Sequence, residues 1–277
     1  MLATENSNKA VALADSFFPP PPDTPIIPNT TYPEPLQAKG IFSRKDICAA
    51  IKKLKVFKAS GKDGIQNIIL QKCVDTIIDH LYYIYRAILK LVEYPSCWLI
   101  ILTIVLCETG KMAYNVTKSY HPISLLNTLG KLFLMLVAAD LFSLAEKHNL
   151  LPPTQFGDQP GRCTTDTMHL VAQKIKDAWR KKNVTSILFL DIQAAFPNTV
   201  KDHLLHNMKT RHVPAPYIRL FDHLLSNQQT QLGFDNFLSN PIDISNGDAP
   251  YLCFSMHSTM QILLTSHRGR MNSLQVL

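Results

Sequence analysis

The chain has 277 residues, 28 Lys and Arg against 21 Asp and Glu, and a formal net charge of +7. Hydrophobic residues make up 46% and charged residues 18%, which is enough apolar material for a core and excludes a chain that is disordered throughout. The length allows one large domain or two small ones. The basic charge suits a polyanionic partner, but it is equally compatible with plain solubility.

Cysteine spacing and hydropathy exclude several other classes. The six cysteines form no CxxC pair, so we expect neither a zinc cluster nor a disulfide scaffold, and an intracellular protein of the cytoplasm or nucleus is the default. No apolar signal segment follows Met1. The longest uncharged stretch, Tyr94 to Cys107, is too short to span a bilayer, so we expect no membrane partner.

The first 40 residues hold eight of the 18 prolines. Proline removes backbone donors and disfavours helix at the residue before it, so residues 1–40 are predicted to be an extended arm or linker, with simple disorder as the alternative. A helix is expected to begin near Ser43, which forms a capping-box pattern with Asp46. Ile47, Ile51 and Leu54 then share one helical face.

The remaining predicted elements mix helices and strands. Helices are expected over residues 66–75, 78–92, 124–148, 165–182, 197–211 and 215–226. Strands are expected over 99–107 and 186–191, followed by a hairpin of 229–234 and 240–245. Because this order lacks regular βαβ alternation, the predicted fold class is α+β.

Asp191 is the sharpest candidate for chemistry, because it ends a predicted buried strand. A carboxylate there can hold a hard cation such as Mg²⁺, but two-metal phosphoryl transfer needs at least a second carboxylate. A solvent-facing or capping Asp191 is the alternative.

Two basic segments are further candidates. The loop of residues 157–165 can present backbone N–H groups and Arg162 to a phosphate, with ordinary capping chemistry as the alternative. Lys111 follows a glycine and can reach a triphosphate, or it is simply a surface lysine. The histidines show neither HxxxH nor HExxH spacing, and GxGxxG is absent.

Four motifs in chain order carry a family resemblance. They are Lys58-Ala-Ser-Gly-Lys-Asp-Gly-Ile65, Lys118-Ser-Tyr-His-Pro-Ile-Ser-Leu-Leu126, Gln155-Phe-Gly with Pro-Gly-Arg162 and Thr-Thr-Asp166, and Phe189-Leu-Asp-Ile-Gln-Ala-Ala-Phe196. Together they resemble the reverse transcriptase of non-LTR (LINE-like) retrotransposons, especially fungal ones, over about residues 40–247.

The resemblance implies a fold and a set of functional residues. The fold would be the fingers (41–185) and a partial palm (186–247) of a right-hand polymerase, which copies an RNA template from a DNA primer with Mg²⁺. Asp191 matches the first metal-binding aspartate, and Phe196 matches the aromatic residue beside the sugar 2′ position. The remaining matches concern phosphate or nucleic acid: Lys111, His121 and Arg162 at the incoming nucleotide, and Lys58, Lys62 and Arg162 along the nucleic acid. At His121 the family has arginine, so a permanent charge is lost.

The tail of residues 248–277 departs most from the family. The family has Gln-Gly-x-Pro-Leu-Ser after the hairpin and later an aromatic-x-Asp-Asp turn, whereas no Asp follows Asp248 here. Synonymous codons for Pro250 to Ile262 can be chosen so that reading from each third base gives Leu-Ser-Met-Leu-Leu-Tyr-Ala-Leu-Tyr-Asn-Ala-Asp. A similar shift across Met271 to Leu277 gives the run into the Asp-Asp turn. We therefore predict a frameshift near Gly247 to Ala249.

The sequence thus predicts a truncated, frameshifted reverse-transcriptase-like chain with little or no polymerase activity. Its tail is expected to be poorly ordered. The alternatives are a non-catalytic RNA- or DNA-binding remnant, an inert pseudogene product that never accumulates as a folded protein, and a polymerase that borrows carboxylates from another chain.

Overall fold

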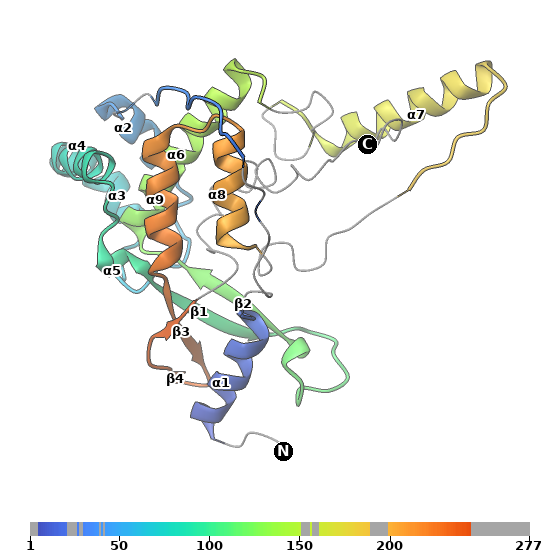
Figure 1. Ribbon diagram of the computed structural model, residues 1–277. Coiled ribbons are helices and arrows are strands. Elements are labelled where there is room, and N and C mark those ends of the chain that lie inside the picture. The colour runs from blue at the N-terminus through green and yellow to red at the C-terminus, as the bar shows by residue number, and fades with distance from the viewer. Residues whose placement is uncertain are drawn as a thin grey trace.

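The uncharged run that follows Ser96 forms the central strand of a five-stranded sheet (Figure 1). The computed structural model describes residues 5–20, 27, 30–38, 40, 42–150, 156, 161–188 and 199–244. In it, β1 (Ile100–Cys107) pairs antiparallel with β2 (Tyr120–Leu125) and parallel with β3 (Gln229–Phe234). β3 also pairs antiparallel with β4 (Phe237–Leu238) and β5 (Ile242–Asp243). Among the described strands, β2 therefore lies at the edge of the sheet, and two segments over 100 residues apart in the chain pair as β1 and β3.

A helical body packs against one end of this sheet (Figure 1). Its helices are α2 (Arg44–Lys53), α3 (Asn67–Lys72), α4 (Val74–Leu91), α5 (Ser96–Leu99), α6 (Thr128–Lys147), α8 (Lys201–Thr210) and α9 (Ala215–Ser226). One core unites them, because Ile47 of α2, Phe133 of α6 and Phe221 of α9 belong to the same buried cluster. That cluster draws on both predicted regions, 41–185 and 186–247; the division into fingers and palm stays a prediction.

The start of α2 confirms the capping box. The Asp46 N–H donates to Ser43 Oγ at 3.2 Å, and the Ser43 N–H donates to the Asp46 carboxylate at 2.9 Å. The predicted apolar face is also confirmed, since Ile47, Ile51 and Leu54 are all buried. Local sequence therefore sets both the start of this helix and the side that it turns to the core.

α6 is the central helix of the core. It is the one described helix that is long and apolar enough to cross a membrane, but more than half of its apolar window is buried within the protein. Phe133 is fully buried, and its ring centroid lies 6.2, 5.3 and 6.1 Å from those of Phe42, Tyr85 and Tyr94. These contacts explain the hydrophobicity of α6 as that of a core helix.

The prediction of an extended arm is wrong for residues 6–17, which form α1 (Asn6–Phe17). Its buried residues Ala10, Leu13 and Ala14 share a helical face and pack against Val105 of β1 and Leu232 of β3. The prolines begin only at Pro19, after the helix has ended, so a proline count over 40 residues concealed it.

Residues 30–38 do follow the prediction of an extended arm, since they contain no helix or strand. They lie along α8 and the residues after it: the Leu36 N–H donates to the His212 carbonyl at 2.8 Å, and Tyr32 Oη lies 3.0 Å from His206 Nδ1.

Three boundaries near strands also differ from prediction. The predicted helix 124–148 begins only at Thr128, because Ser124 and Leu125 belong to β2. Residues 186–188 of the predicted strand 186–191 have no regular structure, and Leu188 is 69% exposed; the rest of that strand lies outside the described residues. The predicted helix 197–211 begins at Lys201 within the described chain.

The predicted hairpin is confirmed, but the chain that returns along β3 forms two short strands, β4 and β5.

The predicted helix 165–182 corresponds to α7 (Thr164–Arg180), which extends away from the body (Figure 1). None of its side chains is buried. Overall, the mixture of helices with one sheet of parallel and antiparallel pairs confirms the α+β class and is consistent with part of a polymerase fold.

Candidate nucleotide and nucleic-acid site

The loop of residues 58–65 is fixed to the start of α6. The Asp63 carboxylate accepts from the Thr128 N–H at 2.8 Å, while the Asp63 N–H donates to Asn127 Oδ1 at 3.0 Å. Thr128 Oγ1 also donates to the Ile65 carbonyl at 2.5 Å. A carboxylate at a helix N-terminus satisfies a free N–H and meets the positive end of the helix dipole. Asp63 therefore caps a helix that begins 65 residues later in the chain.

This fixed loop presents two of the predicted nucleic-acid-binding residues. Lys58 and Lys62 are both exposed. Lys131, in the first turns of α6, is half-buried, and burial lowers its pKa, with a smaller lowering from the charge of Lys58. Lys131 and Lys58 thus lie near enough to act on each other, and Lys62 stands on the same loop; such a set of cations suits the phosphates of a nucleic acid.

Replacing Asp63 with asparagine is expected to destabilise the chain by about 1 kcal/mol, within the range measured for lost helix caps. The amide keeps an acceptor oxygen but loses the negative charge beside the helix start. Urea unfolding measures the change. Lys62→Gln, one residue away and exposed, serves as the control and should leave the unfolding midpoint nearly unchanged.

The turn after β1 brings together the other two cationic candidates. Lys111 Nζ lies 2.8 Å from the Glu108 carboxylate, and both side chains are partly exposed. His121 lies on β2 opposite Leu106, and its charge also acts on Glu108. Lys111 and His121, predicted to face an incoming triphosphate, therefore share one carboxylate as their neighbour.

The pKa of Glu108 lies below its ordinary value of 4.5, chiefly because Lys111 donates a hydrogen bond to it. A lowered pKa means that the contact stabilises the fold above about pH 4.5 and is lost as the pH falls through the lowered value. NMR titration of the Glu108 carboxyl measures this directly. We expect Lys111→Met to return the pKa toward 4.5; an unchanged pKa in that variant would show that the contact does not form.

Arg162 lies just before α7, with its guanidinium carbon 5.3 Å from the centroid of the Phe156 ring. The Cys163 N–H beside it donates to the Asp166 carboxylate at 2.7 Å, and this bond lowers the pKa of Asp166. Asp166 thus already satisfies one of the N–H groups that the predicted phosphate cradle would offer. The observed contact is the capping chemistry that was the alternative; residues 157–160 of the cradle lie outside the described residues.

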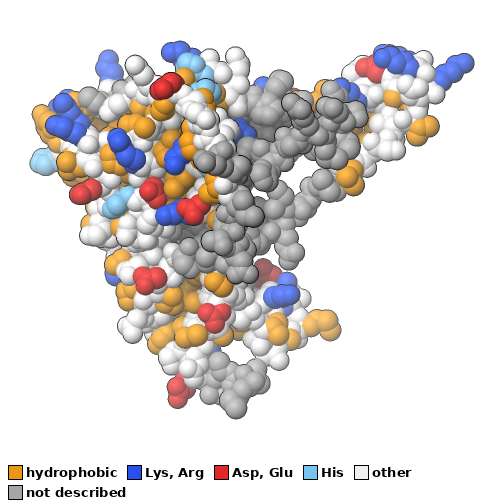
Figure 2. All heavy atoms as spheres, viewed as in Figure 1, with side chains coloured by type: hydrophobic (Ala, Val, Ile, Leu, Met, Phe, Trp, Pro, Cys, Tyr) orange, Lys and Arg blue, Asp and Glu red, His pale blue; other side chains and the backbone are white. Residues whose placement is uncertain are grey.

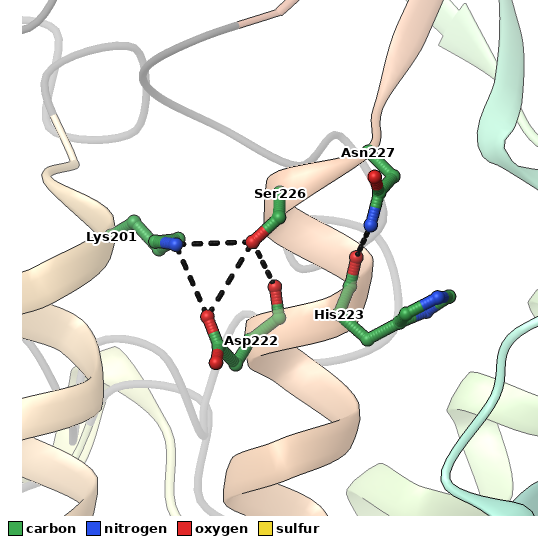
Figure 3. Close-up of polar contacts among 5 residues, drawn as sticks. All are labelled: Lys201, Asp222, His223, Ser226 and Asn227. Atoms are coloured by element: carbon green, nitrogen blue, oxygen red, sulfur yellow. Dashed lines mark hydrogen bonds and ion pairs between the residues drawn. The ribbon is translucent and has the colours of Figure 1, made fainter.

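Asp191 and Phe196 also lie outside the described residues, and their predicted roles stay predictions. The chain resumes at Thr199, just before α8. Lys201, at the first position of α8, contacts the Asp222 carboxylate at 3.1 Å and Ser226 Oγ at 3.0 Å, both on α9 (Figure 3). These contacts attach the start of α8 to α9.

The donor set for a metal ion is incomplete within the described part of the chain. No group of three or more His, Cys, Asp or Glu side chains there could hold a metal ion. The predicted Mg²⁺ rests on Asp191, which lies outside the described residues, so this metal site stays a prediction.

The acidic partners were missed from the sequence. The sequence placed Asp63 in a motif rich in turn residues and gave it no role of its own, yet it fixes the loop that presents Lys58 and Lys62. Glu108 stands three residues before Lys111, a spacing at which opposite charges often meet in helices and turns, and this was the one available signal.

Comparison with known proteins agrees with these motifs. Residues 110–239 match the family model of reverse transcriptase (RNA-dependent DNA polymerase). This range begins in the turn after β1 and contains β2, α6, α7, α8, α9, β3 and β4. The match therefore covers Lys111, His121, Arg162, Asp191 and Phe196, and it supports a reverse transcriptase domain in this chain.

Named relatives are enzymes of mobile elements. The chain is 31% identical over 197 residues to the "Probable RNA-directed DNA polymerase from transposon BS" of Drosophila melanogaster, which covers 71% of this chain and 22% of the relative. It is 30% identical over 190 residues to the "Probable RNA-directed DNA polymerase from transposon X-element" of Drosophila melanogaster, a match over 69% of this chain and 21% of the relative. It is also 30% identical over 184 residues to the "RNA-directed DNA polymerase from mobile element jockey" of the same species, over 66% of this chain and 20% of the relative. The chain thus spans about a fifth of the length of these relatives.

Proposed function

We propose that this chain derives from a non-LTR retrotransposon reverse transcriptase and does not polymerise nucleotides by itself. The observation that carries the proposal is the combination of a reverse transcriptase match over residues 110–239 with a departure from the family pattern after the hairpin, where Asn246-Gly-Asp-Ala-Pro-Tyr-Leu-Cys253 stands in place of Gln-Gly-x-Pro-Leu-Ser. Two-metal phosphoryl transfer needs carboxylates on both ions, and Asp191 is the one palm aspartate that the motifs identify. A frameshift before residue 250, as the shifted-frame reading of residues 250–277 indicates, would keep the other palm aspartates out of the translated chain.

The proposal assigns the remaining residues their family roles. Phe196 would lie beside the nucleotide sugar, and Lys111 and His121 would face the triphosphate. Arg162 would contact phosphate or template, with an RNA template and a DNA primer as substrates. The fungal type stays a prediction, since the relatives named above are from Drosophila.

Primer extension tests the proposed loss of polymerase activity. The full chain is incubated with a primed RNA template, the four deoxynucleoside triphosphates and Mg²⁺, beside a retroviral reverse transcriptase as positive control. We expect no extension above background. Extension that Asp191→Asn abolishes would overturn the proposal, because it would show that this chain completes a working metal site.

A second function, nucleic-acid binding without catalysis, is favoured by the exposed Lys58 and Lys62 on a fixed loop. Phosphate contacts release counterions, so binding should weaken steeply with salt. The double variant Lys58→Gln/Lys62→Gln should lower the slope of log affinity against log salt by up to about 0.9 per lost contact on a duplex. Affinity that stays flat from low to high salt in the unaltered chain would exclude this function.

A further inference from the structure

α7 carries an apolar stripe that the described part of the protein does not bury. Met168, Val171, Ile175 and Trp179 follow one another at three- and four-residue steps and so share one side of the helix. None is buried; Met168 is 66% and Trp179 is 69% exposed. The other tryptophan of the chain, Trp98, is 9% exposed and belongs to the core. Trp179 therefore offers an accessible aromatic face on an extended element.

The end of the helix that carries Trp179 is strongly basic. Its cations are Lys174, Lys176, Arg180, Lys181 and Lys182, all exposed. Figure 2 shows Lys and Arg side chains gathered at the outer end of this arm. Arg180 is ion-paired with Asp177 at 3.0 Å. Lys176 stands one helical turn before Trp179, and Arg180, Lys181 and Lys182 follow it directly, so positive charges flank the indole along the chain.

The combination of an exposed aromatic ring with several cations on α7 indicates which kind of partner can bind there. A second copy of α7 would bring the same lysines together, and like charges at close range oppose association. A hydrophobic partner would leave the cations uncompensated. A single-stranded nucleic acid supplies what both features need, because every base has a face that stacks on an aromatic ring and every nucleotide carries a phosphate.

We propose that α7 is a single-strand binding arm in which Trp179 stacks on a base while Lys176, Lys181 and Lys182 contact the flanking phosphates. The inference rests on the proposed function in that the chain meets nucleic acid. It adds a contact separate from the Lys58–Lys62 loop. Recognition by stacking and charge is independent of sequence, so RNA and DNA single strands should both bind.

Intrinsic fluorescence tests the arm, because Trp98 and Trp179 are the two tryptophans of the chain. The full chain is titrated with oligothymidylate and with oligouridylate at several salt concentrations. We expect both strands to quench the emission. Trp179→Phe should remove the quenching and keep most of the affinity, since phenylalanine can still stack; the affinities of the Trp179 variants are read from the anisotropy of a labelled oligonucleotide. Trp179→Leu keeps apolar bulk without an aromatic face and should weaken binding about fivefold or more. Lys176→Gln should lower the salt slope by about 0.7.

Several outcomes would overturn the arm. Equal affinities for the Phe and Leu variants would mean that position 179 contributes only apolar bulk. A Trp179 response to phosphatidylserine vesicles but not to the oligonucleotides would point to a membrane surface, and emission that changes with protein concentration alone would point to a second copy. Binding that responds to Lys58→Gln/Lys62→Gln but to no Trp179 variant would remove the arm and leave the proposed function standing. Circular dichroism of each variant confirms that the helix is retained.

Discussion

Phe133→Ala is expected to lower the free energy of unfolding by about 3–5 kcal/mol, the range for deleting a fully buried phenylalanine. The ring sits among Phe42, Tyr85 and Tyr94, with the closest centroid at 5.3 Å, so its removal leaves a cavity that several rings line. These neighbours belong to separate segments of the helical body, which limits how far the site can collapse. Chemical denaturation of the full chain measures the loss.

The matched control is Phe57→Ala. Phe57 is 95% exposed, so the same deletion there should change stability by no more than about 0.5 kcal/mol. Similar losses at the two positions would contradict the placement of Phe133 at the centre of the core.

Gly61→Ala is the second large prediction, with an expected loss of about 3 kcal/mol, at the upper end of the range for overpacking. A Cβ at this position would lie 2.4 Å from both the carbonyl carbon and the oxygen of Leu126, and 2.6 Å from the Asn127 nitrogen. These are backbone atoms at the start of α6, which cannot rotate away as a flexible side chain would. The loop must therefore move, and the hydrogen bonds of Asp63 to Asn127 and Thr128 would be broken.

Gly64→Asn separates the contact from general effects of losing a glycine in this loop. Gly64 has φ +65°, a conformation that asparagine tolerates better than most residues, and a Cβ there would meet nothing within 4 Å. We expect a small loss of stability and unchanged nucleic-acid binding. Gly61→Ala should reduce both stability and binding, because the same displacement moves Lys58 and Lys62. Unaltered binding with Gly61→Ala would show that the loop position does not matter for the interaction.

Helices with a local signal could be predicted from the sequence. Ser43 and Asp46 fix the start of α2 by hydrogen bonds to neighbouring backbone groups, and the spacing of its apolar residues predicts which face is buried. β2 escaped prediction because Pro122 lies inside it and its apolar residues run on toward α6. Proline is tolerated there since β2 lies at the edge of the sheet that the described strands form. α1 escaped because the proline-rich run that follows it dominated the composition of the first 40 residues.

The candidate site was predictable as a set of cations and not as an arrangement. The motifs named Lys58, Lys62, Lys111, His121 and Arg162, and all five lie within the described residues. Their acidic partners depend on tertiary contacts, as Asp63 and Thr128 show across 65 residues. The exposed face of α7 could not be foreseen either, because the same apolar period serves equally for a core helix.

The measurement that tests the central claim most directly is the genomic DNA sequence across codons 245–277 and the bases that follow. The proposed loss of the ancestral frame near Gly247 to Ala249 predicts a second frame that reads Pro-Leu-Ser near codon 250 and reaches an aromatic-x-Asp-Asp turn just past Leu277. Bases that cannot encode those shifted residues would contradict the claim. The tail would then be genuine coding sequence, and the proposed cause of inactivity would fall.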